Sequence, residues 1–238
     1  MKNLIIAFTA FFAFNVSTIN AQSLQEFFTK TDTFLSTYVS QGKVDYKGIK
    51  GNVGELDALL KIAKNVSVST SQPKDYQAFW INAYNLSVIK GIIDNYGIKS
   101  PLDKKGFFDK TKYELAGTSI TLNDIEHKNL RPKFNDARFH FVLVCGANGC
   151  PPLIAEAYTP ANLENLLEQQ TIKALNDSSF IRVSGKKVAF SEIFKWYKED
   201  FVTKSSNEID YLNKYRKEKV PENAKVTYYS YDWRLNSK

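Results

Sequence analysis

One stretch of the sequence, residues 139–152, constrains the fold most. It joins the most apolar run beyond the first 21 residues to a glycine-rich turn, and it contains both cysteines of the protein, Cys145 and Cys150. A short, continuous apolar run rich in β-branched and aromatic residues is typical of a buried strand. Gly and Asn tolerate a positive φ, so residues 146–149 can turn sharply. The sequence therefore predicts a core strand over residues 138–145 that brings two sulfur atoms to the surface.

The first 21 residues have the features of a secretory signal peptide. A short basic start is followed by a nearly unbroken apolar run from Leu4 to Val16 and by a small, polar exit that ends at Ala21. This order of segments predicts cleavage after Ala21. The apolar run is too short for a good membrane span, and no later stretch is apolar enough for one. We therefore expect a periplasmic or extracellular protein without a transmembrane segment in the mature chain.

Residues 22–238 are expected to form a single globular domain. The whole chain has 238 residues, 43% of them hydrophobic, which is enough to bury a sizeable core. Its formal charge of +7 comes from scattered Lys and Arg residues. Such scattered charges mostly serve solubility, and in an exported protein they favour anionic envelope polymers over nucleic acid. The predicted partner is therefore an unknown small molecule, a peptide or an envelope polymer, and not a nucleic acid.

The periodicity of apolar residues predicts an α+β fold, in which a small, mostly antiparallel sheet centred on strand 138–145 is packed and flanked by helices. Apart from that strand, the predicted elements are helices over 24–40, 52–65, 75–96, 161–176, 191–201 and 209–215, hairpins of 113–116 with 119–122 and of 180–183 with 187–190, and a last strand over 226–233.

The helix predicted over residues 75–96 is apolar on nearly every side, which indicates burial on all sides. Asn82 and Asn85 lie inside this apolar surface, one turn apart. A buried amide without a partner costs about 1–3 kcal/mol, so both side chains need partners. They either bond backbone groups of a neighbouring loop or serve a polar role at an active site.

Only two histidines are available for catalysis. His140 falls in the predicted strand, where a lone histidine is usually a hydrogen-bonded core residue. His127 lies near the end of a short helix that Thr121 is expected to cap, with Asp124 and Glu126 close by in sequence. His127 is therefore the predicted base, and Glu126, Asp124 or Asn82 could orient its imidazole.

The two cysteines allow a catalytic and a structural interpretation. Cys150 precedes Pro151 and Pro152, and proline favours the first helical position, so Cys150 could cap a helix whose dipole lowers the thiol pKa. Cys145 would then be a packed or resolving thiol. In an exported protein the two can instead form a disulfide, which would contribute about 2 kcal/mol and fix the shape of the loop. A Cys-x4-Cys spacing is not a standard zinc site, and no nucleotide-binding motif occurs, so neither a metal nor a cofactor is predicted.

Four motifs follow one another in the order seen in one protein family. They are Trp80-Ile81-Asn82-Ala83-Tyr84-Asn85, then Leu122-Asn123-Asp124-Ile125-Glu126-His127, then His140 to Cys145 with Cys150-Pro151-Pro152-Leu153, and finally Tyr231-Asp232-Trp233-Arg234-Leu235-Asn236.

The chain thus resembles the domain of unknown function 547 family, from about Val44 to the end. The resemblance implies no established activity. The motif positions include all five residues selected on chemical grounds, which are Asn82, Glu126, His127, Cys145 and Cys150.

Two functional hypotheses follow. The first is a thiol-dependent hydrolase or acyltransferase with Cys150 as nucleophile, His127 as base, and Glu126, Asn82 and Cys145 in the same site. The second is a non-catalytic exported binding domain in which a Cys145–Cys150 disulfide shapes a recognition loop. Thiol–disulfide exchange is a third, for which the Cys-x4-Cys spacing is a poor match to the usual Cys-x-x-Cys.

Overall fold

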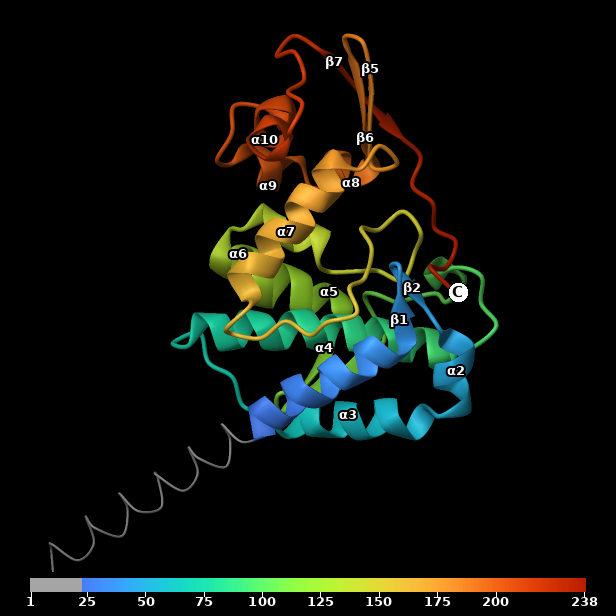
Figure 1. Ribbon diagram of the computed structural model, residues 1–238. Helices are drawn as coiled ribbons and strands as arrows, with labels where there is room; N and C mark the ends of the chain where they lie inside the picture. The colour runs from blue at the N-terminus through green and yellow to red at the C-terminus, as the bar shows by residue number, and fades with distance from the viewer. Residues whose placement is uncertain (1–22) are drawn as a thin grey trace, which may run out of the picture.

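The computed structural model describes residues 23–238 (Figure 1). The signal peptide predicted over residues 1–21 lies outside the described residues. Two hydrophobic clusters organise the described chain, one around helix α4 and one around a three-stranded sheet. The predicted α+β class is confirmed, because helices flank several small antiparallel sheets.

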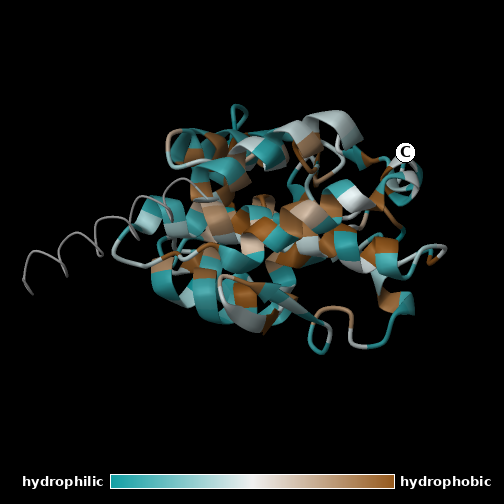
Figure 2. Cartoon of the chain, turned by 90° about the horizontal axis from the view of Figure 1, so that it is seen from below, coloured by the Kyte–Doolittle hydropathy of each residue, from teal (hydrophilic) through white to brown (hydrophobic). Residues whose placement is uncertain are grey.

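Helix α4 (Pro73–Asp94) is the centre of the first cluster. From Tyr76 to Ile93 every residue except Lys90 is buried, so the predicted burial on all sides is confirmed. Figure 2 shows apolar residues concentrated towards the middle of the molecule. The elements around α4 include the helix of residues 23–38, α2 (Tyr46–Gly51), α3 (Val53–Asn65), η1 (Pro101–Asp103) and the hairpin of β3 (Lys112–Leu115) with β4 (Thr118–Thr121).

The second cluster lies at the other end of the molecule, at the top of Figure 1. Strands β5 (Ile181–Ser184) and β6 (Lys187–Ser191) form the predicted second hairpin. Strand β7 (Lys225–Tyr229) pairs with β6 in parallel. Three short helices cover this sheet, α8 (Glu192–Trp196), α9 (Lys198–Val202) and α10 (Glu208–Tyr215). The predicted helix over 191–201 is therefore two helices, divided at Tyr197.

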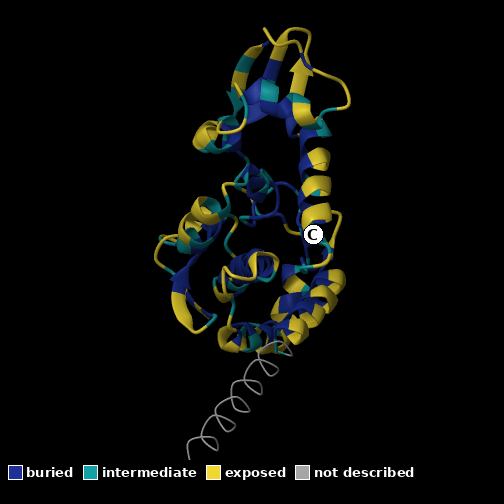
Figure 3. Ribbon diagram, turned by 90° about the vertical axis from the view of Figure 1, so that its left-hand side faces the viewer, coloured by how far each residue is buried: buried dark blue, intermediate teal, exposed yellow. Residues whose placement is uncertain are grey.

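Helix α7 (Leu163–Asn176) connects the two parts, because it contacts both α4 and α10. Leu163, Leu166 and Leu167 belong to the first cluster, whereas Ala174 and Leu175 belong to the second. Figure 3 shows buried residues along the inner sides of the elements and exposed residues outside.

The strand predicted over residues 138–145 is wrong. Residues Ala137–Phe141 form a 3-10 helix, η3, and the following residues are buried but pair with no strand among the described residues. The Asn85 side chain takes the place of a neighbouring strand, accepting from the Val144 amide at 2.9 Å and donating to the Val142 carbonyl at 3.0 Å. A continuous apolar run indicates that a segment is buried, but it does not distinguish a buried strand from another buried segment. The fold is therefore not centred on a sheet at this segment.

Residues 232–238, here called the carboxyl-terminal clamp, make main-chain hydrogen bonds to segments that are far apart in the sequence. The amide of Val44, in β2 (Lys43–Val44), donates to the Asn236 carbonyl at 2.9 Å; β2 pairs with β1 (Val39–Ser40). The Asn236 amide donates to Gly146 at 3.0 Å, and the Gly149 amide donates to Asp232 at 2.8 Å. The predicted strand over 226–233 therefore ends at Tyr229, and the rest of this segment holds the loop between the cysteines.

Candidate functional site

A cavity of about 370 Å³ opens beside the loop between the two cysteines. Cys150 packs against both hydrophobic clusters, so the cavity lies where the two parts of the molecule meet. Aromatic rings and a few polar groups form its wall. The lining residues that bear on function are Tyr84, Phe108, Asp109, Glu126, His140, Cys145, Cys150, Trp196, Tyr197, Tyr231 and Trp233.

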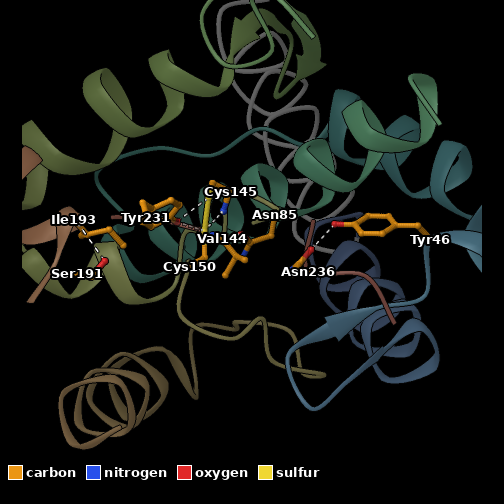
Figure 4. Close-up of a disulfide and its surroundings, with 9 residues drawn as sticks. All are labelled: Tyr46, Asn85, Val144, Cys145, Cys150, Ser191, Ile193, Tyr231 and Asn236. Carbon is orange, nitrogen blue, oxygen red and sulfur yellow. Dashed lines mark hydrogen bonds between the residues drawn. A yellow bond between two sulfur atoms is a disulfide. The ribbon is translucent and has the colours of Figure 1, made fainter. Parts of the chain in front are cut away.

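Cys145 and Cys150 form a disulfide at this cavity (Figure 4). The Tyr231 hydroxyl donates to the Cys150 sulfur at 2.8 Å and lies 3.1 Å from the Cys145 sulfur. The Cys145 amide also donates to the Cys150 sulfur, at 3.0 Å. Burial raises the pKa of Tyr231, so its hydroxyl stays protonated at neutral pH and can donate.

The loop that carries the disulfide depends on a glycine. Gly146 has a φ of +81°, and a Cβ atom there would lie 2.7 Å from Ile92 Cδ1 of helix α4. Residues 151 and 152 are not helical, so the predicted helix after Cys150 is absent. Cys150 therefore caps no helix, and no helix dipole acts on its sulfur.

Glu126 reaches the cavity from an unusual turn of the chain. Thr121 caps the short helix α5 (Leu122–Asp124) as predicted, accepting from the Asp124 amide at 3.1 Å. The chain then forms a π-helix, η2 (Ile125–Leu130), before α6 (Arg131–Phe134). Single π-helical turns occur frequently at functional sites. The Glu126 side chain is only 9% exposed, and its Oε1 has no hydrogen-bond partner in the part of the chain that the structure describes.

His140 lines the cavity beside Glu126. Its Nε2 lies 2.6 Å from Asp200 Oδ2, and its Nδ1 lies 4.0 Å from Glu126 Oε1. Arg131 donates to the same Asp200 carboxylate through Nε at 2.6 Å and Nη2 at 3.0 Å. Burial raises the pKa of Asp200, but the hydrogen bonds from His140 and Arg131 outweigh burial and hold this pKa well below its usual range.

Two of the predicted site residues lie elsewhere. His127 Nδ1 is 2.5 Å from Arg131 Nη1, its ring stacks on Tyr197 at 6.2 Å, and it is not among the residues that line the cavity. Asn82 bonds the backbone of Tyr158, donating at 2.6 Å and accepting at 3.1 Å, as the first of its two interpretations predicts. The structure thus brings Glu126, Cys145 and Cys150 together, but not His127 or Asn82.

The site residues predicted from the sequence do not include His140 or the aromatic wall of the cavity, which consists of Trp196, Tyr231 and Trp233. His140 was assigned to the core because it followed Phe139 in a predicted strand, and its ring indeed packs 4.1 Å from Tyr197. The same residue nevertheless borders the cavity. The signal that could have found Tyr231 and Trp233 was their place in the last of the four motifs.

Residues 68–175 match a family model described as a protein of unknown function, DUF547. This match supports the resemblance of the chain to that family. The matched segment contains Asn82, Glu126, His127, His140 and both cysteines, whereas Trp196 and Tyr231 follow it in the chain. No curated protein and no solved structure matches the chain.

Within residues 23–238, none of the helices is both long enough and apolar enough to cross a membrane. The same residues contain no group of three or more His, Cys, Asp or Glu side chains arranged to hold a metal ion. The chemical groups that line the cavity include aromatic rings, Asp109, Asn123, Glu126, His140 and the disulfide.

Proposed function

We propose that this chain is an exported binding domain that holds a small molecule in the cavity beside the Cys145–Cys150 disulfide. The observation that carries the proposal is a cavity of about 370 Å³ with aromatic walls and convergent polar groups, next to sulfurs that are bonded to each other. Ligand sites are typically concave, mostly apolar and furnished with a few well-placed polar groups.

The disulfide and the carboxyl-terminal clamp support this function by holding the cavity wall in one shape. The disulfide closes the loop of residues 146–149, and the amides of Asn148 and Gly149 donate to Arg234 and Asp232, each at 2.8 Å. A wall held in its bound conformation loses less entropy on binding, which favours affinity.

Two features support export. The sequence of residues 1–21 has the pattern of a signal peptide. A disulfide persists in oxidising compartments such as the periplasm and the extracellular space.

A second candidate function is a thiol-dependent hydrolase or acyltransferase that acts when the disulfide is reduced. One observation favours it: the Tyr231 hydroxyl and the Cys145 amide both contact the Cys150 sulfur, and such donors would stabilise a thiolate. Glu126 and His140 line the same cavity. In this version His140, rather than His127, is the better placed base.

Thiol titration combined with a binding screen tests the two functions. For binding, we expect residues 22–238 to show no free thiol before reduction, and the oxidised protein to bind members of a library of neutral, cationic and anionic fragments. Trp196 and Trp233 line the cavity, so their fluorescence reports occupancy.

Hydrolysis of a p-nitrophenyl ester by the reduced protein, lost in Cys150→Ser and His140→Gln but kept in His127→Gln, would establish the second function instead. Absence of any bound fragment in the oxidised protein would overturn the binding function.

A further inference from the structure

We infer that the cavity recognises a small organic cation, that is, an amine or quaternary ammonium group attached to an apolar body. This inference rests on the proposed binding function and names its ligand class. Three observations support the inference: the aromatic wall, the charges around the cavity and the Glu126 oxygen that lacks a hydrogen-bond partner among the described residues.

The aromatic wall presents ring faces close to one another. The Tyr231 and Trp233 rings lie 4.7 Å apart, and Trp196 lies 5.1 Å from Tyr231 and 5.9 Å from Trp233. Trp196 is 46% exposed, although an indole of this size is normally covered in a folded protein. A cation held over such rings is attracted to their electron-rich faces, and clusters of rings are the usual receptors for quaternary ammonium groups.

The charges at the cavity are acidic in a chain that is basic as a whole. The whole sequence carries a formal charge of +7, yet the lining residues among those described include Glu126 and Asp109 and no Lys or Arg. Asp109 is exposed and Glu126 is buried, so one carboxylate lies in solvent and the other inside. A cationic ligand would therefore meet two carboxylates and no cationic Lys or Arg side chain among the described lining residues.

Inside the protein, the Glu126 carboxyl group is hydrogen-bonded to the Tyr197 side chain and interacts electrostatically with Arg131. Its Oε1, however, is buried, has no hydrogen-bond partner among residues 23–238 and lies 4.0 Å from His140 Nδ1, beyond hydrogen-bond reach. The polar lining residue next to Glu126 is His140, and its Nε2 is bonded to Asp200. Asp200 in turn accepts two hydrogen bonds from Arg131, so the guanidinium acts on Glu126 through its charge and makes its hydrogen bonds to another carboxylate.

A cation in the cavity would supply a partner for this Glu126 oxygen in a setting where water screens their attraction little. Electrostatic attraction strengthens as the effective dielectric constant falls, so a partly enclosed cavity favours the charged ligand over its neutral analogue. An anion would face Glu126 without compensation. A neutral aromatic molecule would gain from the rings alone.

The test uses three probes of similar size with the oxidised protein: benzyltrimethylammonium, benzyl alcohol and benzenesulfonate. Isothermal titration calorimetry and the fluorescence of Trp196 and Trp233 measure each affinity. We expect the cation to bind about tenfold more tightly than the alcohol, as about 1.4 kcal/mol of added attraction gives. Benzenesulfonate is expected to bind most weakly of the three.

Three variants test which residues cause the preference for the cation over benzyl alcohol. Glu126→Gln keeps the shape of the side chain and removes its charge, so the cation should lose its advantage over benzyl alcohol. Glu222→Gln removes an exposed carboxylate outside the cavity lining and is the matched control. Because Glu126 is buried and its substitution can disturb folding, Trp196→Leu provides a second test at an exposed position. It should also reduce the affinity for the cation.

The outcomes separate this inference from the proposed function. Equal binding of the cation and the alcohol, or tighter binding of benzenesulfonate, would overturn the cation inference and leave a binding cavity in place. A cation preference that survives both Glu126→Gln and Trp196→Leu would also overturn it. Failure of all three probes overturns the cation inference, while the fragment screen of the oxidised protein decides separately whether the cavity binds anything.

Discussion

Asp200 is the residue on which the polar side of the cavity depends. It accepts hydrogen bonds from His140 and from Arg131, whose guanidinium also lies 4.7 Å from the centre of the Tyr197 ring. Through this one carboxylate, helix α9 holds a histidine of η3 and an arginine of α6. The three groups fix the edge of the cavity on which Glu126 lies.

Replacing Asp200 by Asn should lower the free energy of unfolding by about 1.5–3 kcal/mol at pH 7, because hydrogen bonds between charged groups are lost. The pKa of Asp200 is depressed in the folded state, so its contribution is complete above the unfolded pKa of about 3.9 and is lost as the pH falls through the folded value. The gap between wild type and variant should therefore narrow as the pH falls from 5 towards 2. Urea denaturation over this range measures it.

The control for this pH dependence is Asp232→Asn. The hydrogen bond from Arg234 lowers the pKa of Asp232 to about 2, but this ion pair lies in solvent, where such pairs contribute little. A pH dependence of stability that is the same in wild type and Asp200→Asn would contradict the role given to Asp200.

Asn85→Ala should be one of the most destabilising single substitutions in the chain. Its amide satisfies the buried amide of Val144 and the buried carbonyl of Val142, and each unpaired group costs about 1–3 kcal/mol. Asn95→Ala is the matched control, since that side chain bonds one carbonyl, of Gly91, at the less buried end of the same helix. Thermal unfolding should show a much larger fall in Tm for Asn85→Ala; equal falls would contradict this account.

At the scale of elements, α4 packs tightly enough that a single methyl group matters. A Cβ atom on Gly91 would lie 2.6 Å from the Tyr113 hydroxyl and 2.8 Å from the Phe107 ring. Gly91→Ala should therefore destabilise the protein by about 1–3 kcal/mol through overpacking, despite the better helix propensity of alanine.

Gly54→Ala in α3 is the comparison, because a Cβ there meets nothing within 4 Å. It should stabilise the protein by about 0.4–1 kcal/mol. Chemical denaturation of both variants measures whether each substitution lowers or raises the free energy of unfolding. Stabilisation by Gly91→Ala would show that Phe107 and Tyr113 yield more readily than their burial suggests.

The elements that the sequence predicts well are those whose pattern is local. The burial of α4 on all sides, the Thr121 cap and the hairpins of β3 with β4 and β5 with β6 all follow from residues close together in the chain. The 138–145 segment was misassigned because its partner is a side chain, Asn85, from a distant helix. The periodicity of apolar residues within a segment cannot predict a hydrogen-bond partner from a distant part of the chain.

The candidate site was predictable in part for the same reason. Cys145, Cys150 and Glu126 stand out by residue type, and all three line the cavity. His127 was preferred to its neighbour in space, His140, because helical spacing suggests a shared face with Asp124. The π-helix η2 widens that turn, and the ring of His127 instead contacts Arg131 and Tyr197.

At the scale of the whole molecule, the disulfide joins a loop that both hydrophobic clusters contact. Replacing Cys145 and Cys150 by Ala should lower the free energy of unfolding by about 2 kcal/mol, because the closed loop is short. The fold should persist, since the two clusters do not depend on the bond. Circular dichroism with urea denaturation checks this; loss of the folded state in the double variant would show that the clusters need the bond.

The carboxyl-terminal clamp should matter more than the disulfide. Deleting residues 234–238 removes the main-chain hydrogen bonds that Arg234, Leu235, Asn236 and Lys238 make to residues 44, 99, 146 and 148, each worth about 0.5–1.5 kcal/mol. It also removes the bond from the Tyr46 hydroxyl to Asn236.

None of the deleted residues lines the cavity, yet ligand affinity should fall together with Tm, because the loop of residues 146–149 loses its support. The Arg234→Ala variant distinguishes the contribution of the main-chain hydrogen bonds from that of the Arg234 side chain. This exposed side chain bonds only Asp232, so the variant keeps the clamp and should resemble wild type in both measurements. If the deletion lowered Tm but left the affinity for a cavity ligand unchanged, the disulfide and the remaining hydrogen bond from Gly149 to Asp232 would suffice to hold the cavity wall.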